Sequence, residues 1–148
     1  MSQYTLPRHI DVRKASKQEA KVSGTIPVDQ LLRLGSSLHN STGEIFVSMR
    51  FSKDEADRSL VEIETSCNLE LTCQRCLEVV KVNMATQARL AMIFPEAKGD
   101  YLPLPDGMEA LLTNDPCDTW EAVEDELILA LPAYPNHPDG KCDLPSST

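Results

Sequence analysis

The most regular pattern along the chain is an alternation of apolar and polar residues from 59 to 72. The residues expected on the inner face are Val61, Ile63, Thr65, Cys67, Leu69, Leu71 and Cys73. A period of two over that length is typical of an antiparallel strand with one buried face. A second alternating run follows at residues 79–94. Together the two runs predict a long β-hairpin.

Shorter segments with alternating or apolar residues predict the strands that neighbour this hairpin. Residues 21–28 predict a short strand or the approach to a helix, residues 44–52 predict a strand, and residues 110–112 predict a short edge strand. With the hairpin they give an antiparallel β-meander of three to five strands with one apolar face. Because that face needs a cover, the sequence predicts an α+β fold in which two helices cover the meander.

Two segments have the spacing of helices. Residues 28–38 carry a loose stripe of leucines, which predicts the first. The second begins at Asp118, because Asp118 and Glu121 have the spacing of a capping box and an apolar stripe follows them. Pro132 is expected to end that helix.

Length and composition predict the organisation of the chain. At 148 residues it is expected to form one domain with a real core. Within it we expect a polar, basic N-terminal arm at 1–20, a long acidic loop at 95–117 and a turn-rich tail at 133–148. The sequence lacks the apolar run of a membrane span and the apolar segment of a signal peptide. We therefore expect a cytoplasmic protein with no membrane partner.

The net charge of −9 is unevenly distributed. Residues 1–23 carry five basic residues against two acidic ones, whereas residues 95–148 carry two basic residues against twelve acidic ones. Nucleic-acid binding needs a concentrated basic surface, and only a modest one is offered, at the N-terminus. The acidic C-terminal third would attract a basic partner and repel phosphates. Alternatively, these acids only keep the protein soluble.

The turn of the hairpin carries a CxxC motif, Cys73 and Cys76, which is half of a metal knuckle. The other place where His and Cys lie close together is His137 and Cys142, separated by residues that favour a turn. The candidate cofactor is therefore one structural zinc ion held by Cys73, Cys76, His137 and Cys142. Such a set leaves no open coordination position, so the site would staple the tail to the hairpin rather than catalyse.

Other interpretations of these residues stay open. In the simplest, Cys73 and Cys76 are reduced surface thiols and His137 is a solvated loop histidine. A thioredoxin-like pair would open a helix, whereas this motif precedes a strand-like run. A hydrolase is not indicated, because we find no recognisable nucleophile setting and no glycine-rich phosphate loop. No small-molecule substrate is expected.

Two stretches together resemble a known family. LTCQRC at residues 71–76 and VEDELILALP at residues 123–132 are similar to the YceD family, whose members are described as large ribosomal RNA subunit accumulation proteins. In outline the resemblance extends from about Leu6 to Cys142. It implies a cytoplasmic bacterial protein, without established enzymatic activity, that is needed for normal accumulation of the large-subunit ribosomal RNA.

The resemblance also bears on the metal site. Some relatives have a cysteine where this chain has His137, an exchange that suits a metal ligand. This chain departs from relatives with a fuller set of tail cysteines, because its tail offers one histidine and one cysteine.

The role that the resemblance implies admits two modes of action. Genes of the family commonly neighbour one for a small large-subunit ribosomal protein, and the acidic last third favours binding such a basic protein. Its expected contacts are Glu121, Glu124 and Glu126. The alternative is direct binding and protection of precursor ribosomal RNA. Its expected contacts are Arg8, Arg13, Lys14 and Lys17, with Arg75 at the hairpin tip as a further candidate. A thiol- or zinc-dependent enzyme is the third alternative.

Overall fold

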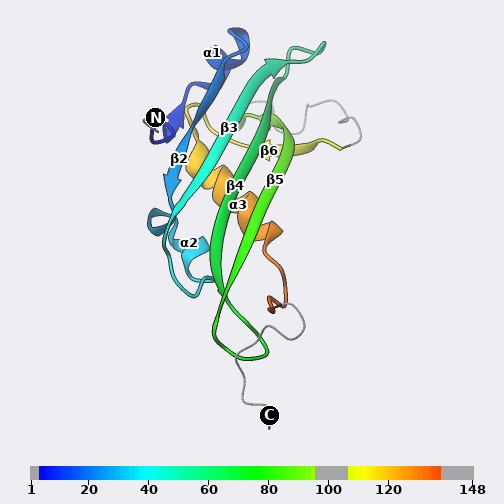
Figure 1. Cartoon of the computed structure of the whole chain (residues 1–148). Helices are drawn as coiled ribbons and strands as arrows, with labels where there is room; N and C mark the ends of the chain where they lie inside the picture. The colour runs from blue at the N-terminus through cyan, green and yellow to red at the C-terminus, as the bar shows by residue number, and fades with distance from the viewer. Residues whose placement is uncertain (1–3, 96–106, 138–148) are drawn as a thin grey trace.

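The centre of the fold is a five-stranded sheet in the order β2-β3-β4-β5-β6, seen in a computed structural model that describes residues 4–95 and 107–137 (Figure 1). Its strands are β2 (Lys21–Pro27), β3 (Glu44–Lys53), β4 (Ser59–Thr72), β5 (Val79–Ile93) and β6 (Glu109–Leu112). The first four pair antiparallel, and β6 joins β5 in parallel. A separate ribbon pairs β1 (His9–Ile10) with β7 (Cys117–Asp118). The predicted α+β fold is confirmed, with a parallel rather than antiparallel edge strand.

The long hairpin predicted from the alternating pattern is confirmed. β4 and β5 pair without a break, from Leu60 opposite Ala91 to Thr72 opposite Val79. All seven residues predicted for the inner face, from Val61 to Cys73, are buried. Burying one large aliphatic side chain contributes about 1.5–3 kcal/mol, so this face holds much of the core.

The predicted C-terminal helix is α3 (Thr119–Ala130), which crosses one face of the sheet (Figure 1). Its start is the predicted cap, because the Asp118 carboxylate accepts the Glu121 N–H at 3.1 Å. Val123 and Leu127 are fully buried against the sheet. In the described part of the chain, no helix is long and apolar enough to cross a membrane.

The prediction of one helix over residues 28–38 is wrong. The chain forms a 3-10 turn, η1 (Val28–Gln30), and a single helical turn, α2 (Leu32–Gly35). Between them Leu31 has φ −101° and ψ 89°, outside the helical region. Leu31 and Leu34 are buried in the core. The leucine stripe therefore belongs to two short helical turns that pack on the sheet, and not to one continuous helix.

The predicted polar arm at 1–20 is, in its described part, a packed part of the fold. It contains β1 and a helix that the sequence did not indicate, α1 (Val12–Lys17). Asp11 caps this helix by accepting the Lys14 N–H at 3.0 Å. Val12 and Ala15 enter the core. Among the described residues, three helices rather than two therefore pack on the sheet.

The segment before β1 runs along the edge strand β2. Thr25 donates its N–H to the Tyr4 carbonyl at 2.7 Å, and Leu6 donates its N–H to the Thr25 carbonyl at 2.8 Å. This contact requires glycine at position 24, because a Cβ there would lie 2.6 Å from the Tyr4 oxygen. Leu6 is 1% exposed as a result.

Candidate metal centre and charged surfaces

The tip of the β4–β5 hairpin is a tight turn that orients its two cysteines. Cys73 donates its N–H to the Glu78 carbonyl at 2.8 Å, and Leu77 donates its N–H to the Cys73 carbonyl at 2.8 Å. Leu77 closes the turn with φ +64°, in the left-handed region. The cysteines therefore lie in a turn between strands, as the sequence predicted, and not at the start of a helix.

The tail beyond α3 returns to this turn. Gln74 donates its N–H to the Pro135 carbonyl at 2.8 Å, which fixes the tail against the tip. His137 then lies beside both cysteines, with its N–H 3.5 Å from Cys73 Sγ and its Nδ1 3.4 Å from Cys76 Sγ. The ligand atoms of Cys73, Cys76 and His137 all lie within 4.8 Å of one another. Three of the four predicted ligands are thus brought together, and Cys142 lies outside the described residues.

The histidine is oriented for metal binding by its other ring nitrogen. His137 Nε2 lies 2.8 Å from the Val79 carbonyl, an acceptor, so Nε2 carries the hydrogen and Nδ1 presents a lone pair to the thiols. In a tetrahedral zinc site, a cysteine sulfur and a histidine nitrogen lie about 3.5 Å apart. The observed 3.4 Å between Cys76 Sγ and His137 Nδ1 fits that spacing. The group can hold a metal ion.

The thiols of the chain differ sharply in acidity. Burial of the Cys73 thiol opposes its ionisation. However, hydrogen bonds from the backbone of Cys76, His137 and Arg75 and from the Cys76 thiol lower the pKa of Cys73 to about 5. By contrast, burial raises the pKa of Cys67 to about 11. The lowered pKa of Cys73 favours its thiolate, the form that binds metals, whereas Cys67 is an inert core residue.

The three predicted acidic contacts lie in different environments. Glu121 is exposed and Glu126 is half-buried. Burial raises the pKa of Glu126, and the nearby charges of Glu109 and Asp125 raise it further. Glu124 is 7% exposed, so it lies in the interior and not on the surface where a partner could contact it.

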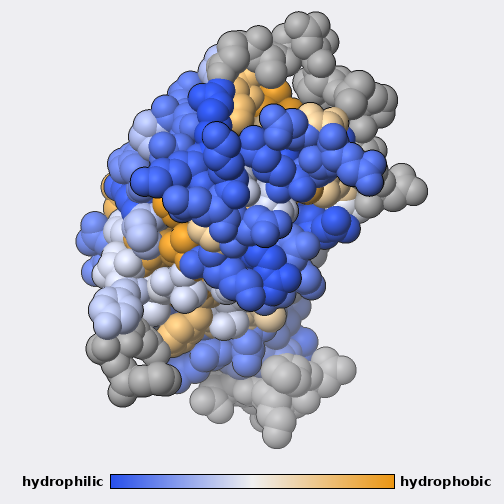
Figure 2. Space-filling model, turned by 90° about the horizontal axis from the view of Figure 1, so that it is seen from above, coloured by the Kyte–Doolittle hydropathy of each residue, from blue (hydrophilic) through white to orange (hydrophobic). Residues whose placement is uncertain are grey.

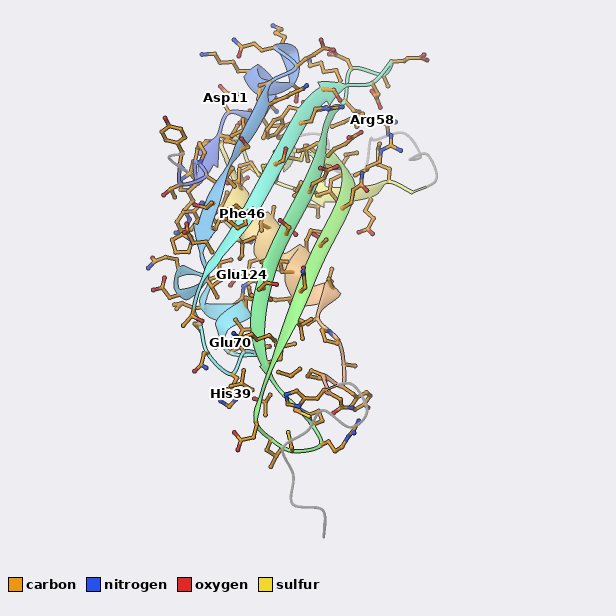
Figure 3. All side chains as sticks on the ribbon, viewed as in Figure 1. Asp11, His39, Phe46, Arg58, Glu70 and Glu124 are labelled. Atoms are coloured by element: carbon orange, nitrogen blue, oxygen red, sulfur yellow. The ribbon has the colours of Figure 1, made fainter. Side chains whose placement is uncertain are left out.

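Glu124 instead joins α3 to α2 (Figure 3). Its Oε2 accepts the Leu34 N–H at 3.0 Å, and its Oε1 lies 3.2 Å from Arg33 Nη2. Leu31, the N-cap residue of α2, makes no side-chain cap hydrogen bond. Glu124 therefore supplies the cap from a helix 90 residues later in the chain.

The predicted basic contacts do not form one surface. Arg13, Lys14 and Lys17 lie together on α1 and line one hollow. Arg8 belongs elsewhere, because it stacks over the Trp120 ring at 5.3 Å and pairs with Asp118 at 3.3 Å. Arg75 is exposed in the turn at the opposite end of the hairpin.

Sequence reasoning missed two further basic residues that line the same hollow as Arg13, Lys14 and Lys17: Lys53 and Arg58. Both flank the β3–β4 turn, which the structure places beside α1. The sequence shows this connection as charged, but only the position of α1 makes it part of the hollow. Because α1 was not predicted, no sequence signal could bring these residues together.

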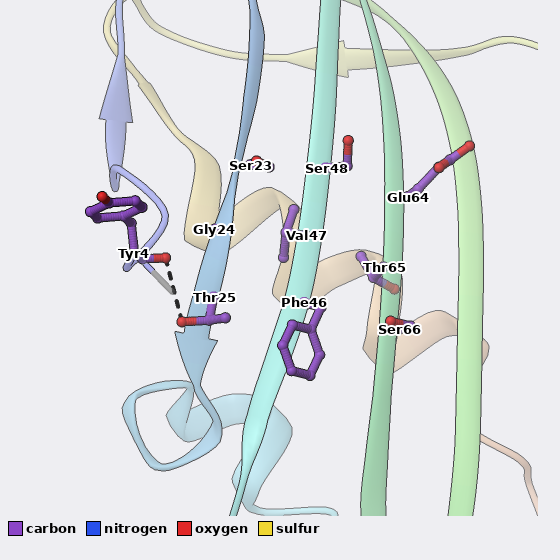
Figure 4. Close-up of a pocket in the computed structure, with 10 residues that line it drawn as sticks. All are labelled: Tyr4, Ser23, Gly24, Thr25, Phe46, Val47, Ser48, Glu64, Thr65 and Ser66. Carbon is purple, nitrogen blue, oxygen red and sulfur yellow. Dashed lines mark hydrogen bonds between the residues drawn. The ribbon is translucent and has the colours of Figure 1, made fainter. Parts of the chain in front are cut away.

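A second hollow, of about 430 Å³, lies over β2, β3 and β4 (Figure 4). Tyr4 and Phe46 give it two aromatic side chains, and serines and threonines supply most of the polar groups. Glu64 is its one charged lining residue among the described ones. This hollow therefore does not suit an anionic ligand.

The fold and the site define an α+β protein built on a five-stranded sheet, in which the tip of the long hairpin and the tail form a potential metal-binding group of two cysteines and one histidine. Residues 61–148 match the family described as "Large ribosomal RNA subunit accumulation protein YceD". This match covers more than half of the chain, and the chain belongs to the YceD family.

A relative agrees with this assignment. The chain is 29% identical over 147 residues to "Large ribosomal RNA subunit accumulation protein YceD" of Haemophilus influenzae, a match that covers 97% of this chain and 83% of the relative. No solved structure shows a significant match to the chain. The family name associates the chain with accumulation of the large ribosomal RNA.

Proposed function

We propose that this protein is a non-enzymatic, cytoplasmic factor in large ribosomal subunit biogenesis, which supports accumulation of the large-subunit ribosomal RNA by binding a basic ribosomal protein. The family supports the coarse role, because the relative is named for large ribosomal RNA subunit accumulation. The observation that carries the mode of action is a surface of four neighbouring acids on α3 and β6. We call it the acidic surface, and it consists of Glu109, Glu121, Asp125 and Glu126.

Asp125 of the acidic surface pairs with Arg33 at 2.7 Å, whereas the other three acids of this surface differ from their neighbours in the fold. Asp115, Asp118 and Glu124 accept backbone N–H groups and pair with arginines, so they serve the structure. By contrast, like charges crowd Glu126, since Glu109 and Asp125 add to burial in raising its pKa. A cationic partner would relieve that repulsion.

The metal group supports a binding role in preference to a catalytic one. We propose one structural zinc ion held by Cys73, Cys76, His137 and Cys142. Thiolates and a neutral imidazole are the ligands that zinc prefers in structural sites. Zinc there would tie the tail to the hairpin tip. With four protein ligands no position would remain for a substrate, so a thiol- or zinc-dependent enzyme is the less supported alternative.

Direct binding of precursor ribosomal RNA is the second candidate function. It is favoured by the grouping of Arg13, Lys14 and Lys17 on α1, at the end of the sheet remote from the cysteines. The two functions use different surfaces and can be tested separately.

Affinity capture from a cell lysate tests the first function. After nuclease treatment, the tagged protein is expected to retain a basic large-subunit ribosomal protein at low salt and to release it at high salt. With that protein purified, Glu121→Gln/Glu126→Gln is expected to weaken binding about fivefold, because each exposed charge contributes up to about 1 kcal/mol. Binding is measured by titration calorimetry.

The matched control is Glu44→Gln/Glu64→Gln, which removes two exposed acids of β3 and β4. It should leave the affinity unchanged. Equal weakening by both pairs would show a general charge effect and contradict the acidic surface. Loss of every captured protein on nuclease treatment would exclude this mode of action.

A further inference from the structure

A hollow of about 800 Å³ lies at the end of the sheet opposite the cysteines, between α1 and the β3–β4 turn. We call it the basic hollow, because five basic residues line it: Arg13, Lys14, Lys17, Lys53 and Arg58. Figure 3 places Asp11 of this hollow and Arg58 at the same end of the molecule. Figure 2, which looks down on that end, shows crowded hydrophilic groups with hydrophobic surface between them.

Three carboxylates also line the hollow, and two of them hold the backbone of α1. Asp11 accepts the Lys14 N–H at 3.0 Å, and Asp115 accepts the Val12 N–H at 2.9 Å. The third, Asp57, pairs with Lys53 at 3.1 Å through a side chain that is 84% exposed. Five positive and three negative groups line the hollow, and Asp54, which pairs with Arg58 at 2.7 Å, adds a fourth negative group beside it. The hollow keeps a small positive excess on a chain whose net charge is −9. The charge of the hollow is thus opposite in sign to the net charge of the chain.

Of the three lysines that line the hollow, Lys14 and Lys17 are the most available to a ligand, because Lys53 pairs with Asp57. Neither Lys14 nor Lys17 forms an ion pair with another residue in the described part of the chain. They lie three residues apart on α1, where like charges repel each other. An anion between them and Lys53 would remove that repulsion.

The floor of the hollow is apolar and partly aromatic, formed by Met92, Ile93 and Phe94. The Arg13 guanidinium stacks on the Phe94 ring at 4.0 Å, and the Arg13 side chain remains 52% exposed. A guanidinium plane held in this way is a surface on which a nucleic-acid base can stack. An acidic peptide would bind the lysines but has no base to stack on the Arg13–Phe94 pair.

We propose that the basic hollow binds single-stranded RNA, with Lys14, Lys17 and Lys53 contacting phosphates and the Arg13–Phe94 pair stacking on a base. Aromatic stacking beside a basic track is the common design of single-strand binding sites. This proposal rests on the second candidate function, direct RNA binding, and adds to it Lys53 and the stacking pair. The site is independent of the acidic surface, so either can fail without the other.

The test is fluorescence anisotropy with the full chain and a fluorescein-labelled single-stranded RNA of about 20 nucleotides. At about 0.1 M salt, Lys14→Gln/Lys17→Gln is expected to bind on the order of tenfold more weakly than wild type. The slope of log affinity against log salt should fall by about 1.4, which is about 0.7 for each lost phosphate contact. Asp57→Asn, which releases Lys53, should tighten binding about twofold.

The matched control is Lys81→Gln/Arg89→Gln, which removes two exposed charges from β5. It and Glu121→Gln/Glu126→Gln should bind the RNA within about twofold of wild type. Circular dichroism confirms that each variant is folded. The proposal is overturned if wild type does not bind the RNA, if the control pair weakens binding as much as the α1 pair, or if polyglutamate of equal charge binds as tightly.

Discussion

Removal of metal is expected to lower the thermal stability of this protein markedly. Protein purified under reducing conditions should contain about one zinc ion per chain. A chelator that strips it should lower the midpoint of thermal unfolding by roughly 10 °C, because losing even about 3 kcal/mol has that effect in a chain of this size. The physical reason is that the metal ion would join the tail to the hairpin tip, so its loss would release the tail. Metal analysis and differential scanning calorimetry measure the two quantities.

Two histidine variants distinguish destabilisation by loss of the metal from destabilisation by the substitution itself. His137→Ala should lose the metal and unfold at the temperature of the chelated wild type, and the chelator should then have no further effect. His39→Ala removes an exposed histidine that contacts Thr72 at 2.9 Å. It should keep both the metal and the response to chelator. Metal-free wild-type protein, or equal losses in both variants, would count against the zinc site.

Replacement of Glu124 is expected to have the second largest effect. Glu124→Ala removes the acceptor of the buried Leu34 N–H and one of the two acidic partners of Arg33, so we expect a loss of about 3 kcal/mol in the free energy of unfolding. The unfolding midpoint should fall by roughly 10 °C. Glu124→Gln keeps an acceptor for the N–H and should lose less. Urea denaturation gives the free energies.

The exposed Glu121, one turn earlier on the same helix, provides the comparison. Glu121→Ala makes the same change of charge and should cost under about 1 kcal/mol. A double-mutant cycle with Arg33→Ala then isolates the ion pair. If Glu121→Ala and Glu124→Ala destabilise equally, Glu124 does not cap α2 as its contacts indicate.

Features encoded over a few residues could be predicted from the sequence. The β4–β5 hairpin follows from the alternation of apolar and polar residues along both strands. The start of α3 follows from the spacing of Asp118 and Glu121. The proximity of Cys73, Cys76 and His137 could be predicted because zinc ligands commonly come in pairs at turns. The three residues lie as expected.

Features that depend on tertiary contacts could not be predicted. α1 has six residues and only three buried positions, too few for a helical stripe. Glu124 looks like any acid in the first turns of a helix, and its partner Leu34 lies 90 residues away. Lys53 and Arg58 become part of a basic hollow only once α1 packs beside them. In each case the informative neighbour is distant in the sequence.

The unbroken pairing of β4 with β5 makes the hairpin a stiff spacer. From Leu60 to Thr72 it spans about 40 Å at 3.3 Å per residue. Its tip carries the candidate metal ligands, and its other end borders the basic hollow. A ligand that touched both ends would bind the second end at a high effective concentration, without the entropy cost of a flexible linker. The hairpin would then act as a ruler that favours ligands of one length.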